Sequence, residues 1–182
     1  MKAQIIQVAE EVGHLACQLG SAITTVESCT GGQVASAITD IPGSSRWFES
    51  GFVTYSNVAK QRMVGVSDAT LHAHGAVSAP VVEEMVKGGC CASGAALGVA
   101  VSGVAGPDGG SELKPVGTVW MAWGNSTTTF AHCFHFDGGR ARVRQASVLA
   151  ALQGLRAWLT LLLQDEPAIA DAMKEKYDSA LQ

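Results

Sequence analysis

The sequence predicts an α/β fold with a mixed sheet in a single domain. Short apolar segments rich in β-branched residues alternate with segments whose apolar residues recur at helical spacing. Late in the chain, two strand-like segments flank Gly124-Asn125, which is typical of an antiparallel hairpin and argues against a purely parallel sheet. The 182 residues are 47% hydrophobic, which is enough for one domain with a sizeable core.

In the first third of the chain, turn residues separate the predicted helices and strands. Ile5, Val8, Val12, Leu15 and Leu19 recur at helical spacing, and Gly20 follows as a helix stop. The elements expected next are a strand at 22–26, a helix after Ser28, a turn at Pro42-Gly43, a strand at 47–55, and a helix capped by Ser56 or Asn57 and closed by Gly65.

The rest of the chain continues the alternation. Ser78 is predicted to cap a helix that carries Pro80 in its first turn. Then we expect a buried strand at 96–101, a glycine-rich loop at 102–114, hairpin strands at 116–123 and 127–136, a helix from about 140 to 163, and a short polar helix beginning at Pro167. We expect these elements to form one domain at residues 1–165, followed by a helical tail at 166–182.

Composition excludes several classes of protein. The net charge of −4 provides no general attraction to nucleic acid or to anionic membranes, so neither partner is expected. We also predict that no apolar stretch is long enough to span a membrane. The five cysteines contain no C-x-x-C pair, which favours reduced thiols and a cytoplasmic location. His72 and His74 are expected in a loop, and His132 and His135 on opposite faces of a strand, so we predict no metal and no cofactor.

Ser28 is the first candidate catalytic residue. It lies where the predicted strand passes into a helix, within Glu27-Ser28-Cys29-Thr30-Gly31-Gly32. A helix N-terminus offers unpaired backbone N–H groups, which suit an anion or the oxyanion of an acyl transfer. We therefore expect Thr30, Gly31 and Gly32 to contact the substrate. A simple N-cap role for Ser28 or Thr30 is equally compatible with this stretch.

Tyr55 and Lys60 form the second candidate. If Ser56 caps the helix, Lys60 stands one turn inside it and Tyr55 ends the preceding strand. A lysine becomes a general base when burial or a neighbouring cation lowers its pKa, and a serine nucleophile needs such a base. Tyr55 is expected to relay a proton or to orient the lysine. The usual alternative for such a lysine is a solvated position on a helix face.

Two further segments are candidates for substrate binding. Ser102, Gly103 and Gly106 open a glycine-dense loop at the carboxyl end of a strand, where open α/β sheets place ligands. Arg140 and Arg144 lie four apart on one face at the start of a helix, where cations are unfavourable against the helix dipole. That cost points to an anionic partner such as phosphate. A structural loop and pairing with acidic side chains are the alternatives.

Together these segments resemble the CinA C-terminal domain family over residues 3 to 163. The motifs that carry the resemblance are "ESCTGG" at 27–32, "PGSS" at 42–45, "YSNVAK" at 55–60, "GAVS" at 75–78, "SGVAGPDGG" at 102–110, "KPVGTV" at 114–119 and "GGRARVR" at 138–144. The family often has Thr where Ser102 stands, and usually Asp where Gly139 stands.

The resemblance implies a layered α/β/α fold and hydrolysis of the carboxamide of nicotinamide mononucleotide to nicotinate mononucleotide and ammonia. It also implies the roles of nucleophile for Ser28, base for Lys60 and assisting tyrosine for Tyr55. In many relatives the domain follows another domain, whereas this chain resembles the single-domain form.

A serine amidohydrolase has three alternatives. Cys29 could be the nucleophile in place of Ser28. A penicillin-recognising serine enzyme would need Ser-x-x-Lys, but Gly31 stands three residues after Ser28. The third is a regulatory module that binds a pyridine nucleotide without turning it over.

We also predict a homodimer. Trp120, Trp123, Phe130 and Phe134 on the hairpin, with Trp158 on the long helix, offer apolar surface that one small domain does not fully bury.

Overall fold

The computed structural model describes residues 1–179, which fold around a five-stranded sheet in the order β2-β1-β3-β4-β5. β1 pairs in parallel with β2 and with β3, whereas β4 pairs antiparallel with both β3 and β5. The strands are β1 (Ile23–Glu27), β2 (Phe48–Val53), β3 (Leu97–Gly103), β4 (Thr118–Gly124) and β5 (Thr129–His135). The mixed sheet and its late hairpin are therefore confirmed.

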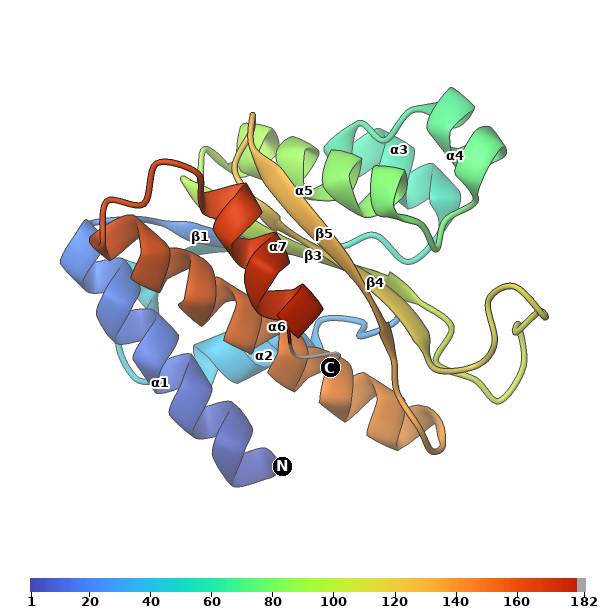
Figure 1. The fold of residues 1–182 in the computed structure, drawn as a ribbon, viewed down its shortest axis with the longest axis horizontal. Helices are drawn as coiled ribbons and strands as arrows, with labels where there is room; N and C mark the ends of the chain where they lie inside the picture. The colour runs from blue at the N-terminus through green and yellow to red at the C-terminus, as the bar shows by residue number, and fades with distance from the viewer. Residues whose placement is uncertain (180–182) are drawn as a thin grey trace.

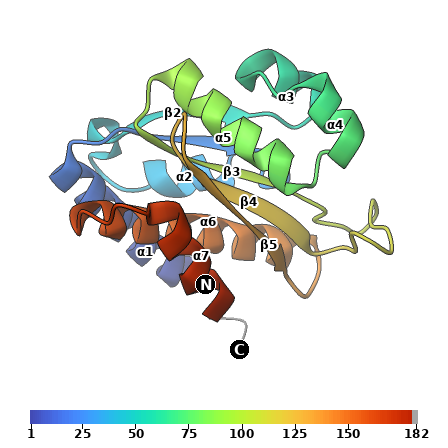
Figure 2. The same cartoon turned by 45° about the horizontal axis from the view of Figure 1, so that its top comes forward.

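Helices cover both faces of the sheet and complete three layers (Figures 1 and 2). One face carries α5 (Ala79–Ser93), with α3 (Asn57–Val64) and α4 (Asp68–His74) beside it. The other face carries α1 (Lys2–Leu19), α2 (Gln33–Thr39), α6 (Arg140–Leu163) and α7 (Ile169–Ser179). A short 3₁₀ turn, Ser44–Arg46, precedes β2. This arrangement confirms the α/β/α sandwich that the resemblance implied.

Alternation along the strands divides the core into two apolar clusters. Val99, Met121 and Trp123 face α1 and α6, whereas Ala100 and Ala122 face α5. All five side chains are fully buried. Both layers of helices are therefore anchored to the sheet by apolar contacts.

The long helix α6 is a core helix, and its glycine at position 154 lets it approach the sheet closely. A Cβ at Gly154 would lie 2.1 Å from the Trp123 ring, whose Nε1 donates to the Ala151 carbonyl at 2.8 Å. By length and hydropathy alone, α6 is apolar enough to cross a membrane, contrary to the expectation from the sequence. Its apolar residues instead pack against α1 and the sheet in this fold.

Two segments differ from the expectations. His72 and His74 lie in α4 rather than in a loop; Leu71 is the single buried residue of that helix, so it lacks an apolar repeat. The C-terminal helix α7 was expected as a short polar helix, but it packs on the core. It buries Met173, and the Tyr177 ring stacks on the Trp123 ring with 5.5 Å between the ring centroids. α7 thus covers part of the aromatic surface that suggested a homodimer. The domain boundary at residue 165 stays a prediction.

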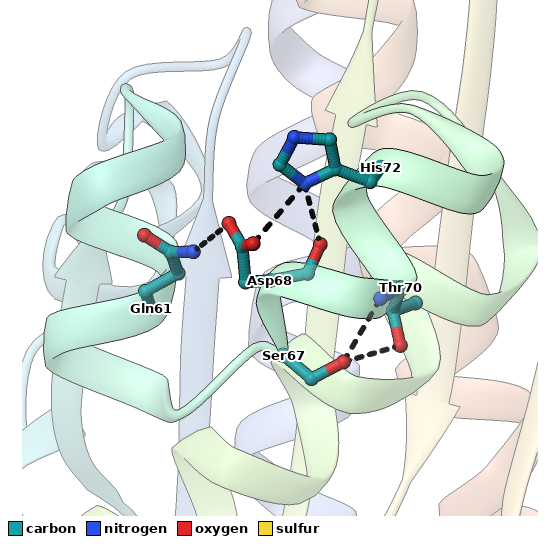
Figure 3. A network of polar contacts seen from close by, with 5 residues as sticks. All are labelled: Gln61, Ser67, Asp68, Thr70 and His72. Atoms are coloured by element: carbon teal, nitrogen blue, oxygen red, sulfur yellow. Dashed lines mark hydrogen bonds and ion pairs between the residues drawn. The ribbon is translucent and has the colours of Figure 1, made fainter.

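A polar network joins α3 to α4 (Figure 3). The Gln61 amide donates to the Asp68 carboxylate at 2.9 Å, and the same carboxylate lies 3.2 Å from the His72 ring. Ser67 caps α4 by accepting from the Thr70 amide at 2.9 Å. Because α3 carries Lys60, this network helps to fix the helix that delivers a candidate catalytic side chain.

Candidate active site

Ser28 lies just beyond β1, at the edge where parallel strands end together. Its backbone N–H donates to the Val101 carbonyl at 2.9 Å, and its own carbonyl accepts from Gly31 at 3.0 Å, so the chain turns sharply into α2. The residue is 9% exposed and opens on a pocket of about 250 Å³. The pocket is lined by Ser28, Cys29, Tyr55, Gly103, Val104, Ala105, Gly106, Asp108, Gly109 and Arg140.

Lys60 reaches Ser28 directly from α3. The N-cap Ser56 accepts from the Ala59 amide at 3.1 Å, so the helix begins where the sequence predicts and Lys60 sits one turn inside it. The Lys60 ammonium donates to Ser28 Oγ at 3.1 Å and to the Thr54 carbonyl at 3.0 Å. The solvated helix-face position is excluded, because Lys60 is only 1% exposed.

The surroundings of Lys60 suit a base better than a permanent cation. Burial lowers the pKa of Lys60, and the nearby Cys29 thiol group opposes that shift. A neutral amine can keep the Thr54 contact as donor while it accepts the Ser28 hydroxyl proton. The same positions of Lys60 and Ser28 therefore suit both the protonated and the neutral form of the Lys60 amine.

Glu27, which the sequence analysis did not single out, fills the N-terminus of α2. Its Oε2 accepts from the amides of Gly32 and Val34, each at 3.0 Å, and its Oε1 accepts from Ala35 at 2.8 Å. The Gly31 amide is also used, by the Ser28 carbonyl. Both amides of the predicted anion site, those of Gly31 and Gly32, are thus already hydrogen-bonded within the protein.

The sequence signal for Glu27 is its place between the predicted strand at 22–26 and the helix after Ser28, and the structure shows why that place matters. β1 is buried along its whole length, and Glu27 is 1% exposed as its last residue. Buried carboxylates require hydrogen-bond donors, and the first turn of the following helix supplies unpaired N–H groups within reach.

The Cys29 side chain lies in the apolar core and is poorly suited to serve as a nucleophile in place of Ser28. Burial raises the pKa of the Cys29 thiol to about 11, and the Glu27 carboxylate adds to the shift. Its side chain packs in the cluster that includes Val34 and Val101. This environment disfavours the thiolate that a cysteine nucleophile needs.

Arg140 closes the far side of the pocket. Its guanidinium donates to the Tyr55 hydroxyl and to the Gly106 carbonyl, both at 3.0 Å. Tyr55 is 57% exposed, so its ring lies at the mouth of the pocket. Tyr55 is therefore hydrogen-bonded to Arg140, whereas the sequence analysis expected it to assist Lys60.

Arg144, one turn further along α6, contacts the Ser28 turn. It donates to the Thr30 carbonyl at 2.9 Å, and a Cβ at Gly31 would lie 3.4 Å from its guanidinium. Thr30 is completely buried. Arg144 and Thr30 thus contact each other and do not line the pocket, and their predicted substrate contacts stay a prediction.

The glycine-dense loop contributes to the pocket, except for its first residue. The buried Ser102 hydroxyl donates to the Ala76 carbonyl at 2.7 Å, which ties β3 to the segment before α5. Gly103 and Gly106 line the pocket, as expected for substrate-binding positions, and Gly106 adopts a φ of +80° that favours glycine. Asp108, for which the sequence analysis predicts no role, also lines this pocket.

A larger hollow, of about 790 Å³, lies elsewhere, between α1 and the segment that precedes β2. Its lining includes Glu10, His14, Cys17 and Arg46. Ser28 does not line it, whereas Ser28 lines the smaller pocket, which is therefore the candidate site. Within residues 1–179, no three His, Cys, Asp or Glu side chains gather as metal ligands would.

Comparison with known proteins places this geometry in context. The profile of the CinA C-terminal domain family matches residues 5–159. The chain is 54% identical over 151 residues to a nicotinamide-nucleotide amidohydrolase PncC of Pseudomonas putida, with 83% of this chain and 94% of that protein covered. It is 53% identical over 156 residues to PncC of Escherichia coli strain K12, with 84% and 93% covered.

A solved structure shows the same fold. The crystal structure of the competence/damage-inducible protein CihA from Agrobacterium tumefaciens is similar with a TM-score of 0.82 at 42% identity. The match covers 86% of this chain and 96% of that chain.

Proposed function

The chain belongs to the CinA C-terminal domain family, and we propose that it is a nicotinamide-nucleotide amidohydrolase with Ser28 as nucleophile and Lys60 as base. The reaction converts nicotinamide mononucleotide and water to nicotinate mononucleotide and ammonia. The observation that carries the assignment of residues is the 3.1 Å contact between Lys60 Nζ and Ser28 Oγ. The names of the close relatives support the choice of substrate.

The first step is proton transfer from Ser28 to Lys60. Neutral Lys60 accepts the hydroxyl proton as Ser28 Oγ attacks the carboxamide carbon, which forms a tetrahedral intermediate. Lys60 then returns the proton to the leaving nitrogen, so that ammonia departs and an ester remains on Ser28. Water attacks this ester with Lys60 again as base, which releases the carboxylate product and restores the hydroxyl.

Backbone amides stabilise the oxyanion of the intermediate. Within residues 1–179, the amides of Cys29, Thr30, Ala105 and Gly106 donate to no other residue. Thr30 does not line the pocket, whereas Cys29, Ala105 and Gly106 do. We therefore assign the oxyanion to the Cys29 amide and to the facing 105–106 segment.

Arg140 binds the phosphate of the nucleotide. Arg140 lines the pocket, and its guanidinium donates hydrogen bonds to Tyr55 and Gly106, which line the same pocket. A guanidinium suits phosphate because it offers several donors in one plane. Arg144 supports the Ser28 turn through the Thr30 carbonyl and does not bind phosphate.

Ammonia release by the purified protein tests the proposed function. The expected result is stoichiometric ammonia and nicotinate mononucleotide from nicotinamide mononucleotide, with much slower release from nicotinamide riboside, which lacks the phosphate. Tight binding of nicotinamide mononucleotide without ammonia release would instead support a regulatory module.

Assembly and location complete the proposal. Val53, Tyr55 and Val58 are exposed near the site, and we assign them to the surface of a homodimer. The five cysteines are free thiols, which supports a cytoplasmic location. Sedimentation of the full chain as a monomer at micromolar concentration would contradict the dimer.

A further inference from the structure

The side chain of Glu27 is a buried carboxylate that does not line the pocket and makes its hydrogen bonds to residues other than Ser28. Three backbone amides, those of Gly32, Val34 and Ala35, donate to its two oxygens at 2.8–3.0 Å. The residue is 1% exposed. A buried carboxylate with three charge-assisted hydrogen bonds is held in one orientation, and it holds its donors in turn.

The contacts of Glu27 span both ends of the nucleophile turn. Its backbone belongs to β1, where its carbonyl accepts from the Thr54 amide at 2.8 Å and fixes it to the neighbouring chain segment. Its side chain crosses the turn and grips the first turn of α2. Residues 28–31 therefore form a short bridge from the end of β1 to the start of α2, and Glu27 holds these two elements together.

Independent contacts act on the middle of that bridge. The Ser28 amide donates to Val101, the Gly31 amide donates to Ser28, and Arg144 donates to the Thr30 carbonyl. These bonds restrain the peptide groups on each side of Cys29. The direction of the Cys29 amide then depends on how the α2 end of the bridge is held, and Glu27 holds that end.

From this geometry we infer that Glu27 is a positioning residue, which fixes the Ser28 hydroxyl against Lys60 and aims the Cys29 amide at the oxyanion. This inference rests on the proposed function. Glu27 gives up no proton and contacts no substrate. It also fills the N-terminus of α2, so the oxyanion must form on the pocket side of the turn and not at the helix end.

Glu27→Gln tests this role because it preserves shape while removing half of the acceptors. The glutamine NH₂ group would face an amide N–H, so at least one of the three hydrogen bonds is lost. A displacement of the turn by 1 Å is enough to slow a reaction about a hundredfold. Thr25→Val is the matched control, since Thr25 is buried in the same strand and its hydroxyl has no partner within residues 1–179.

Labelling of Ser28 by a small fluorophosphonate separates positioning from folding without using the nucleotide. The final extent of labelling, its amplitude, counts the folded active sites. The rate of labelling measures how reactive the Ser28 hydroxyl is and how well the oxyanion amides are placed. We expect the Glu27→Gln rate to fall about a hundredfold at unchanged amplitude, with a matching fall in kcat for ammonia release and little change in KM. Thr25→Val should match the unmodified protein in both measurements.

The inference is overturned if Glu27→Gln lowers only the amplitude and the melting temperature while the labelling rate per folded site stays unchanged. It is also overturned if the unmodified protein is not labelled at Ser28, since there is then no nucleophile to position. Normal labelling without ammonia release from nicotinamide mononucleotide would contradict the proposed substrate alone, and the rate comparison would still decide the role of Glu27.

Discussion

Lys60 Nζ lies 3.1 Å from Ser28 Oγ, although 32 positions separate the two residues in the chain. Ser28 follows β1 and Lys60 comes from α3, which follows the neighbouring parallel strand β2. The carboxyl ends of parallel strands meet at one edge of a sheet, so the fold brings the two side chains together there. The consequences of this contact can be tested at each residue around it.

Replacing Lys60 by arginine should be nearly as damaging as replacing it by alanine. Arginine keeps the positive charge but does not lose its proton in proteins, so it cannot accept the Ser28 proton. The larger guanidinium must also fit a site that leaves Lys60 only 1% exposed. Ammonia release by both variants checks the prediction. Substantial rescue by Lys60→Arg would mean that the residue acts only through its charge.

The rate should depend on pH through Lys60. Burial lowers the pKa of Lys60, and the base is active when neutral, so kcat/KM should rise with pH through this lowered pKa. The midpoint should fall well below the value of about 10.4 for a free lysine. A profile of kcat/KM against pH from purified protein measures it. A rise centred near the free value would show that burial does not tune this lysine.

Substitutions of Arg140 and Arg144 should have different effects when substrates with and without phosphate are compared. A charged hydrogen bond to phosphate is worth roughly 1.5–3 kcal/mol, so Arg140→Ala should cost about ten- to more than a hundredfold in kcat/KM on nicotinamide mononucleotide. It should cost little on nicotinamide riboside.

Arg144→Ala serves as the matched comparison on the same helix face. Because Arg144 holds the Thr30 carbonyl, its loss should reduce turnover of both substrates by a similar factor. Equal losses on both substrates for Arg140→Ala would mean that this arginine supports the structure instead of binding phosphate. No loss on either substrate would place the phosphate elsewhere, at the loop amides that line the pocket.

Tyr55→Phe should lower kcat/KM by about tenfold at most, because the Tyr55 hydroxyl accepts from the charged Arg140 guanidinium at an exposed position, where water can replace it. The Tyr55 hydroxyl accepts from Arg140, and the lysine reaches the serine without it. The small loss should appear mainly in KM for the nucleotide. A loss as large as that of Lys60→Ala would restore the proton relay that the sequence analysis expected.

The sequence predicted most of the local structure around the site. The Ser56 cap, the closing Gly65 and the position of Lys60 one turn inside the helix all follow from local rules of helix formation. The limits of α6 at 140 and 163 were also predicted, because its apolar pattern is long. The α4 helix was missed because it buries one leucine and consists mainly of polar and small residues.

The contacts between distant segments were harder to predict. Local pattern does not say that Arg140 reaches Tyr55 across 85 positions, or that Arg144 turns to the Thr30 carbonyl. Both depend on where α6 crosses the sheet. Glu27 shows a different limit: helix rules predicted free amides at Gly31 and Gly32, and a side chain from the preceding strand had already used the Gly32 amide.

Ammonia release from nicotinamide mononucleotide by Ser28→Ala is the most direct test of the account. The substitution removes one small hydroxyl, so circular dichroism and the melting temperature should stay close to those of the unmodified protein. Turnover should fall to the background of the assay, since the buried Cys29 thiol, with a pKa raised to about 11, does not replace the lost nucleophile. Turnover near that of the unmodified protein, in a folded Ser28→Ala variant, would contradict the assignment of Ser28 as the nucleophile.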